Sequence, residues 1–175
     1  MPTTIPPVKA LLSDGEVAWV RRLRPGDVLA VLALHARLSG RDRYFWFFGL
    51  GVARLGKLAT QLAEDSGVGQ TAVGCFVHDR LVGVARYEIL ADPTQAEIAL
   101  VVDSRTRTLG VATLLLEQLV ISACHEGVRS LVTDVVAESS KMLGVFAALG
   151  LPFRIGRGWP ERKVTLSLGP TTDHP

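Results

Sequence analysis

The sequence has little of what marks specialised classes of protein. Its 175 residues include only two cysteines, Cys75 and Cys124, and these form no C-x-x-C pair. Such sparse thiols argue against a disulfide framework or a zinc cluster, and they predict two buried cysteines in a reducing compartment. The formal net charge is only +2, and most of the basic residues are scattered along the chain. A nucleic-acid partner is therefore not indicated.

Segments that place a protein in a membrane are also lacking. No apolar run approaches the length of a membrane span, and the opening stretch MPTTIPPVKA has no apolar signal-peptide core. We therefore expect a cytoplasmic protein with no membrane partner. No spacing of His, Asp and Glu suggests a metal site, and no G-x-S-x-G motif marks a serine nucleophile.

What is present is the composition of an ordinary globular protein, with 48% hydrophobic and 21% charged residues. The length suits one domain with a sizeable core and is slightly short for two. Three prolines near the start and a polar end predict a flexible arm over residues 1–15 and a disordered tail over residues 170–175. A single domain is expected over residues 16–169.

Hydrophobic periodicity predicts a mixed α/β fold in the order β, α, α, β, β, β, α, β, α, β, β. The turn at residues 78–80 predicts an antiparallel hairpin between the second and third strands. The expected strands cover residues 17–23, 70–77, 81–90, 96–102, 130–136, 153–156 and 163–168, and the expected helices cover residues 28–38, 52–64, 110–126 and about 139–149.

Two patterns near the N-terminus predict which side chains are buried. Val17 and Trp19 are expected to turn inward from the first strand, with Val20 as a further candidate. Leu29 and Leu32 recur at helical spacing and predict the apolar face of the first helix. Asp27 follows a Pro-Gly pair and is expected to cap that helix.

The stretch from residue 96 to residue 117, AEIALVVDSRTRTLGVATLLLE, carries the strongest functional signal. A buried strand is interrupted by one acid, Glu97, and a basic turn leads past Gly110 into a Leu-rich helix. The first-turn N–H groups of a helix, together with its dipole, form a ready phosphate site. We therefore expect a phosphate-bearing ligand at Arg107–Thr113, with Glu97 beside it.

The same stretch resembles a known family. Residues 107–112, RTLGVA, are similar to the acyl-CoA loop [Q/R]-x-x-G-x-[G/A] of the GNAT superfamily of N-acetyltransferases. Residues 137–146, AESSKMLGVF, resemble the second motif of that family, E-N-x-x-M-L-x-x-F. Residues 34–39 and the pair Arg43-Tyr44 resemble an opening found in bacterial protein acetyltransferases of the Pat type. The resemblance covers nearly the whole chain.

The resemblance implies a central mixed sheet of about six to seven strands, with helices on both faces and the fourth and fifth strands splayed apart. It implies acetyl-CoA or another acyl-CoA as co-substrate, with the pantetheine arm in the gap and the pyrophosphate at the helix start. No metal is implied. The residues implied to bind the donor are Leu100, Val101, Val102, Arg107, Thr108, Leu109, Gly110, Val111, Ala112, Thr113, Ser139, Met142 and Phe146.

The resemblance also implies roles in catalysis. Acyl transfer to an amine needs a group that removes a proton, and Glu97 is the candidate general base. The structural alternative is a glutamate near a strand end that faces water or a surface arginine. Many relatives use a tyrosine to protonate the leaving thiolate where this sequence has Phe146. Asp134 is a candidate for binding the acceptor amine or relaying a proton, unless it is a hydrogen-bonded structural aspartate.

The aromatic block at residues 44–48 adds candidates for the acceptor pocket. Within this block, Tyr44 and Phe45 are the candidates for lining the pocket. The alternative is that these aromatic side chains pack into the core. The acceptor would be a protein lysine, as in Pat-like relatives, or a small amine.

Three departures from the family pattern leave the identity of the acyl donor open. Thr108 and Leu109 stand where relatives often carry Gly and Arg, and Ser139 replaces the asparagine of the second motif. These changes should weaken the hold on a nucleotide diphosphate while leaving the pantetheine channel intact. One alternative is therefore an enzyme that takes its acyl group from carrier-protein phosphopantetheine and acylates a small amine in biosynthesis. A second alternative is a non-catalytic acyl-CoA-binding regulatory domain.

Overall fold

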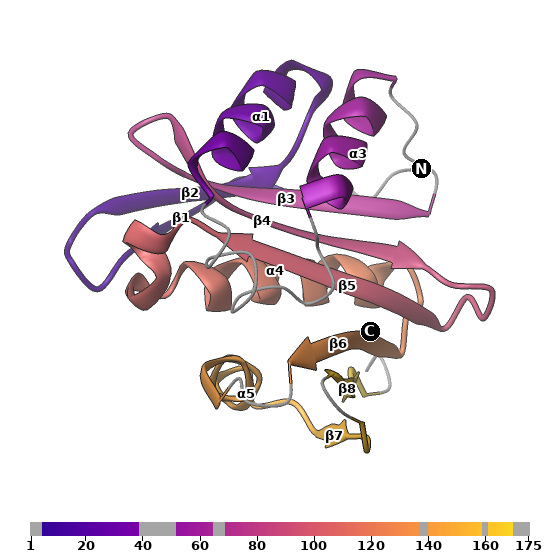
Figure 1. Cartoon of the computed structure of the whole chain (residues 1–175). Helices are drawn as coiled ribbons and strands as arrows, with labels where there is room; N and C mark the ends of the chain where they lie inside the picture. The colour runs from indigo at the N-terminus through magenta and orange to yellow at the C-terminus, as the bar shows by residue number, and fades with distance from the viewer. Residues whose placement is uncertain (1–4, 39–51, 65–68, 137–139, 159–160, 170–175) are drawn as a thin grey trace, which may run out of the picture.

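A mixed eight-stranded sheet with helices on both faces forms the protein (Figure 1). The structure is a computed structural model that describes residues 5–38, 52–64, 69–136, 140–158 and 161–169. The strand order is β1-β2-β3-β4-β5-β6-β8-β7. Its elements are β1 (Val8–Leu11), β2 (Val17–Arg22), η1 (Pro25–Asp27), α1 (Val28–Arg37), α3 (Val52–Ala63), β3 (Gln70–Val77), β4 (Arg80–Ile89), β5 (Gln95–Val102), η2 (Ser104–Leu109), α4 (Val111–His125), β6 (Ser130–Val136), α5 (Ser140–Ala148), β7 (Phe153–Ile155) and β8 (Glu161–Ser167).

This architecture confirms the predicted fold class. Neighbouring strands pair antiparallel everywhere except between β5 and β6, which are parallel. The described sheet has eight strands rather than six or seven, because residues 8–11 form β1 instead of belonging to a loose arm. By pairing with β2, this short strand covers an edge that would otherwise expose unpaired backbone groups.

Two hydrophobic cores lie on opposite faces of the sheet. The α4-side core packs Val111, Leu115 and Leu119 of α4 against the strands. The α1/α3-side core packs Val31 and Leu34 of α1, together with side chains of α3, against the other face. Figure 1 shows α1 and α3 above the sheet and α4 below it. Because side chains alternate along a strand, each position of β5 belongs to one core or the other.

The predicted inward orientation was wrong for Val17 and Trp19 and right for Val20. Ala18 and Val20 are fully buried, whereas Val17 is 38% and Trp19 is 47% exposed. The ammonium of Lys9 lies 5.8 Å from the centre of the Trp19 ring. Because strand side chains alternate with period two, Val17 and Trp19 share one face of β2, and Ala18 and Val20 share the other.

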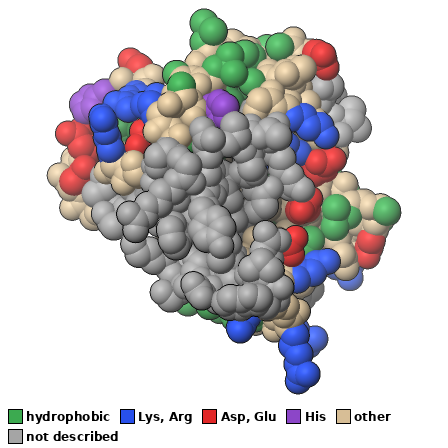
Figure 2. Space-filling view, viewed as in Figure 1, with side chains coloured by type: hydrophobic (Ala, Val, Ile, Leu, Met, Phe, Trp, Pro, Cys, Tyr) green, Lys and Arg blue, Asp and Glu red, His purple; other side chains and the backbone are tan. Residues whose placement is uncertain are grey.

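The predicted apolar face of α1 was also wrong. Leu29 is 78% and Leu32 is 43% exposed, whereas Val31, Leu34 and Leu38 are buried. Nearly every position of this helix is apolar, so helical spacing alone could not choose between the two faces. The view in Figure 2 shows hydrophobic side chains gathered over α1, with acidic and basic side chains interspersed around the rest of the described surface.

Asp27 does not cap α1 with its side chain, contrary to prediction. Its carboxylate instead accepts two hydrogen bonds of 2.8 Å from the guanidinium of Arg21 and one from the backbone N–H of Arg24. The Arg21 hydrogen bonds hold the pKa of Asp27 below its usual value, because they favour the charged carboxylate.

Both cysteines are free thiols in the described structure, as expected. Cys75 is fully buried, and burial raises its pKa to about 12, while Cys124 is half-buried and its pKa is raised for the same reason. Neither environment favours the thiolate that nucleophilic chemistry requires. Among the described residues, no helix is long and apolar enough to cross a membrane.

Candidate active site

The site is built around the divergence of β5 and β6. The two strands pair at only three positions, and the last pair is Glu97 with Val132. Beyond it, β5 continues along β4 as far as Val102, and β6 continues along β8 as far as Val136. In this described part of the sheet the edge of β5 after Glu97 therefore has no strand bonded to it. The predicted splay between the fourth and fifth expected strands is confirmed.

Glu97 lies at the closed end of this gap. Its side chain is half-buried and lies on the α1/α3 side of the sheet, because Ala99 and Val101, two and four positions along β5, belong to the α1/α3-side core. Glu88 of β4 is its partner across the strand pair. The guanidinium of Arg86 donates a 2.8 Å hydrogen bond to the carboxylate of Glu88. The acid is therefore half-buried, in a row of polar groups on one face of the sheet.

The residues from Leu100 to Val102 form the open edge of β5 and are all buried. Leu100 and Val102 point into the α4-side core and Val101 into the opposite core. Their backbone faces the gap on the side away from β4. This is the edge at which the resemblance expects the pantetheine arm.

The expected phosphate site lies at the start of α4. Gly110 has φ +95°, precedes the first helical residue and offers no side chain to cap the helix. The first turn that follows consists of Val111, Ala112 and Thr113, whose N–H groups have no acceptor within the helix by geometry. The positive φ explains the glycine, because residues with a Cβ rarely adopt this conformation. The helix begins one residue later than predicted.

The basic turn before α4 is a 3₁₀ helix, η2. Arg107, Thr108 and Leu109 form its last three positions, and only their backbone belongs to the described structure. Asp103 starts η2, because its carboxylate accepts a hydrogen bond from the backbone N–H of Arg105.

Asp103 also ties this loop to distant parts of the chain, which the sequence did not reveal. It is only 4% exposed, and its carboxylate lies 3.1 Å from Nε of Arg37 and 3.4 Å from Nη2 of Arg80. Its backbone N–H donates to the carbonyl of Val82. Arg37 is the last residue of α1 and also donates to the carbonyl of Leu81. The only sequence signal was an acid placed directly between an apolar strand and a basic turn.

The remaining candidates are distributed around the gap. Phe146 of α5 is fully buried in the α4-side core, and its ring centre lies 6.1 Å from that of Phe153. Asp134 of β6 is exposed and lies two positions beyond Val132, on the same side of the sheet as Glu97. The other candidates are not placed: Tyr44, Phe45 and Ser139 lie outside the described residues, as does the side chain of Met142.

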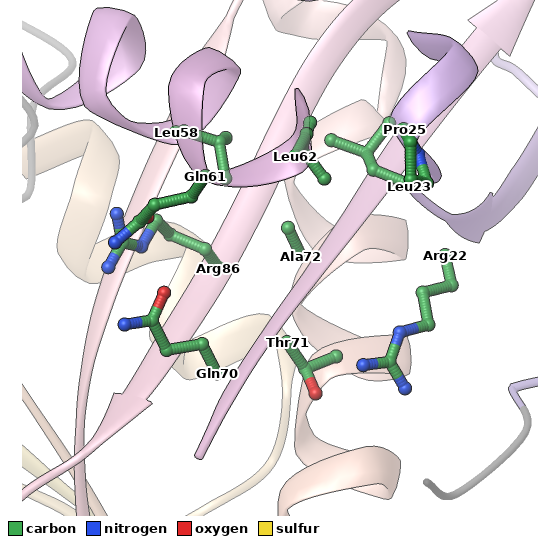
Figure 3. A pocket seen from close by; sticks show the side chains of 10 residues that line it. All are labelled: Arg22, Leu23, Pro25, Leu58, Gln61, Leu62, Gln70, Thr71, Ala72 and Arg86. Carbon is green, nitrogen blue, oxygen red and sulfur yellow. The ribbon is translucent and has the colours of Figure 1, made fainter. Parts of the chain in front are cut away.

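A separate cavity of about 90 Å³ lies beneath α3 (Figure 3). In this view Gln61 of α3 and Arg86 of β4 extend to the same side of the cavity, whereas Arg22 lies across β3 from them. None of the lining residues was predicted to be functional, and this volume suits a few water molecules rather than a nucleotide. The lining residues are Arg22, Leu23, Pro25, Leu58, Gln61, Leu62, Gln70, Thr71, Ala72 and Arg86.

The gap between β5 and β6, the start of α4 and the nearby Glu97 together form the candidate site. Comparison with known protein families agrees with this arrangement. The model of the acetyltransferase (GNAT) family matches residues 44–151. The chain belongs to this family. An acetyltransferase of Pseudomonas aeruginosa is 28% identical over 143 residues, which cover 79% of this chain and 77% of the relative.

Solved structures of the GNAT family share this fold. The GNAT domain of PAT from S. lividans superposes with a TM-score of 0.79 at 21% identity, covering 92% of this chain and 96% of that domain. An N-acetyltransferase from Thermoplasma acidophilum, solved in complex with coenzyme A, has a TM-score of 0.65 at 14% identity, covering 86% of this chain and 98% of that one. The predicted superfamily is therefore confirmed, and the protein is an acetyltransferase-family enzyme.

Proposed function

We propose that this GNAT-family protein transfers an acetyl group from acetyl-CoA to an amine by direct attack in a ternary complex. The proposal rests on the positions of two features at opposite ends of the open edge of β5. The β5–β6 ladder ends at Glu97, and the bare helix start follows Gly110 at the opposite end of the open β5 edge. An acid at the closed end and an anion site at the open end are what a long, phosphate-bearing acyl donor requires.

The described residues fit such a donor. The pyrophosphate would accept hydrogen bonds from backbone N–H groups between Thr108 and Thr113, where the helix dipole favours negative charge. The pantetheine arm would lie along Leu100–Val102 and bond to the open backbone edge. The Thermoplasma acidophilum relative, which was solved in complex with coenzyme A, supports coenzyme A as the carrier of the acyl group.

The chain's own groups would then act on the acceptor. The bound donor supplies an acyl group already activated as a thioester. Glu97 would remove a proton from the attacking amine, directly or through one water molecule. Asp134, exposed on the same side of the sheet, would bind the acceptor while it is an ammonium ion. A backbone N–H near Val102 would donate to the acyl oxygen.

The acceptor we favour is a protein lysine, as in the Pat-like subgroup. The similarity to the S. lividans PAT domain over 92% of this chain supports that choice. The exposed position of Asp134 is compatible with an acceptor presented from outside the molecule. Tyr44 and Phe45 are proposed to line the acceptor pocket, while Ser139, Met142 and Phe146 are proposed to bound the donor side.

The test is donor-dependent thiol release with a panel of amines that includes a lysine peptide and small primary amines. We expect release of coenzyme A only when donor and amine are both present, together with a product that mass spectrometry shows to carry one added acetyl group. Saturable binding of acetyl-CoA without transfer to any amine would contradict the proposal and indicate the non-catalytic binding domain instead.

Thr108 and Leu109 favour a second candidate, in which a carrier protein's phosphopantetheine delivers the acyl group. Both positions depart from the family residues that strengthen the hold on a nucleotide diphosphate. Comparing acetyl-CoA with acetyl-pantetheine separates the two donors. A much lower KM for acetyl-CoA supports free coenzyme A, whereas equal KM values support the carrier.

A further inference from the structure

Thr133 has an unusual environment at the point where β5 and β6 part. It follows Val132, the last residue of β6 that pairs with β5. The side chain is only 2% exposed, and its Oγ1 has no hydrogen-bond partner among the described residues. Buried hydroxyl groups nearly always have a partner, so an orphan of this kind requires an explanation.

The described strand neighbours of Thr133 are apolar. Its neighbours on the same side of β6 are Leu131 and Val135, and its partner on β8 is Val164. All three belong to the α4-side core, which also contains Phe146. A valine would have the same shape without the cost of burying a hydroxyl, so packing does not account for the threonine.

The two faces of the sheet place different groups at the closed end of the gap. Glu97 lies on the α1/α3 side and Thr133 on the α4 side. An acyl group held between them would meet its amine from the Glu97 side. The opposite side of that group would face the hydroxyl of Thr133 and the apolar ring of Phe146, which has no proton to donate.

We propose that Thr133 donates a hydrogen bond to the thioester sulfur as it leaves, which makes it a catalytic residue; the inference rests on the proposed function. The nitrogen lone pair of the amine forms the C–N bond, and the electron pair of the C–S bond passes to sulfur. The amine proton passes to Glu97. Thr133 keeps its own proton, and its O–H stabilises the thiolate until water protonates it. Apolar neighbours strengthen this hydrogen bond because they exclude water.

The test compares Thr133→Val with Thr133→Ser, using Thr71→Val as a control. Thr71 is an equally buried threonine, but it lies on β3, outside the gap. We expect Thr133→Val to lower kcat about tenfold or more, as for other lost donors to developing charge. The loss should grow as the thiol of the acetyl donor becomes a poorer leaving group. Thr133→Ser should recover most of the rate, and Thr71→Val should leave it near that of the unmodified protein.

A second readout does not depend on activity. Replacing an orphan hydroxyl with a methyl group should raise the melting temperature of Thr133→Val by about 2–4 °C. A lower melting temperature, an undiminished kcat, or a loss independent of the leaving thiol would overturn the inference while leaving the proposed function intact. If the unmodified protein acylates no amine, the proposed function fails, and this role of Thr133 fails with it.

Discussion

The carboxylate of Asp103 joins three parts of the chain at the start of η2. It receives guanidinium groups from Arg37 at the end of α1 and Arg80 at the start of β4, and it accepts a hydrogen bond from the backbone N–H of Arg105 in η2. Residues 37 and 103 are 66 positions apart in sequence. A buried charge is tolerated only when it is paired and hydrogen-bonded, so these contacts fix the loop as a unit.

Replacing Asp103 with Asn should therefore weaken donor binding and lower stability together. We expect a loss of about 2 kcal/mol in the free energy of unfolding, because the hydrogen bonds lose their charge assistance and two arginines lose their anionic partner. The KM for acetyl-CoA should rise several-fold as η2 loosens, with a smaller effect on kcat. Urea unfolding and steady-state kinetics measure the two effects.

A matched control for this change is Asp79→Asn, in the turn between β3 and β4. Asp79 is exposed and has φ +61°, a conformation that Asn adopts readily. It should change neither stability nor KM. If Asp103→Asn behaves like Asp79→Asn, Asp103 does not organise the loop.

At the scale of elements, the proposed donor site depends on where α4 lies against the sheet. Gly83 of β4 makes this position possible. A Cβ built on it would lie 2.9 Å from Cδ1 of Leu115 and 3.1 Å from Cγ1 of Val111, the first residue of α4. It would also lie 3.2 Å from the carbonyl oxygen of Val101 on β5. One small residue thus sets the distance between the helix start and the open edge of β5.

The substitution Gly83→Ala should push the first turn of α4 away from the sheet. We expect it to destabilise the protein by about 1–3 kcal/mol, as overpacked cores do, and to weaken acetyl-CoA binding. Calorimetric titration and chemical unfolding give the two quantities.

The control is Gly56→Ala in α3, where nothing lies within 4 Å of the added Cβ. There the change should stabilise the protein by about 0.5–1 kcal/mol, since alanine favours a helix over glycine. Unchanged donor affinity in Gly83→Ala would show that the position of α4 is not critical.

At the scale of the whole molecule, the unit from β5 to α4 was predictable because its signals are local. An apolar run predicts a buried strand, and Gly110 followed by Leu-rich helical periodicity predicts the helix start. Residues 130–136 were likewise placed correctly as β6. The splay between β5 and β6 was expected from the family resemblance alone, because the sequence within each strand does not specify its neighbour.

Other features depended on tertiary contacts that a linear sequence does not reveal. Trp19 and Leu29 were assigned to the interior because apolar residues usually lie there. In the structure the opposite faces of β2 and α1 are the buried ones. The contact of Arg37 with Asp103 joins two separate elements. That the hydroxyl of Thr133 has no partner among the described residues could be recognised only from their arrangement in three dimensions.

In the proposed mechanism, the two faces of the sheet divide the reaction at the closed end of the gap, with Glu97 as the base. Glu88 offers a matched control, because it is also a half-buried glutamate and pairs directly with Glu97 across β4 and β5. The most direct measurement is the steady-state kinetics of Glu97→Gln beside Glu88→Gln, with acetyl-CoA and the best amine from the panel.

We predict that Glu97→Gln lowers kcat by about 10²-fold or more while the KM for acetyl-CoA changes by less than about twofold, since a general base acts on the amine and not on donor binding. Glu88→Gln should keep most of the rate. A kcat for Glu97→Gln equal to that of the unmodified protein, or equal losses in the two variants, would contradict the account.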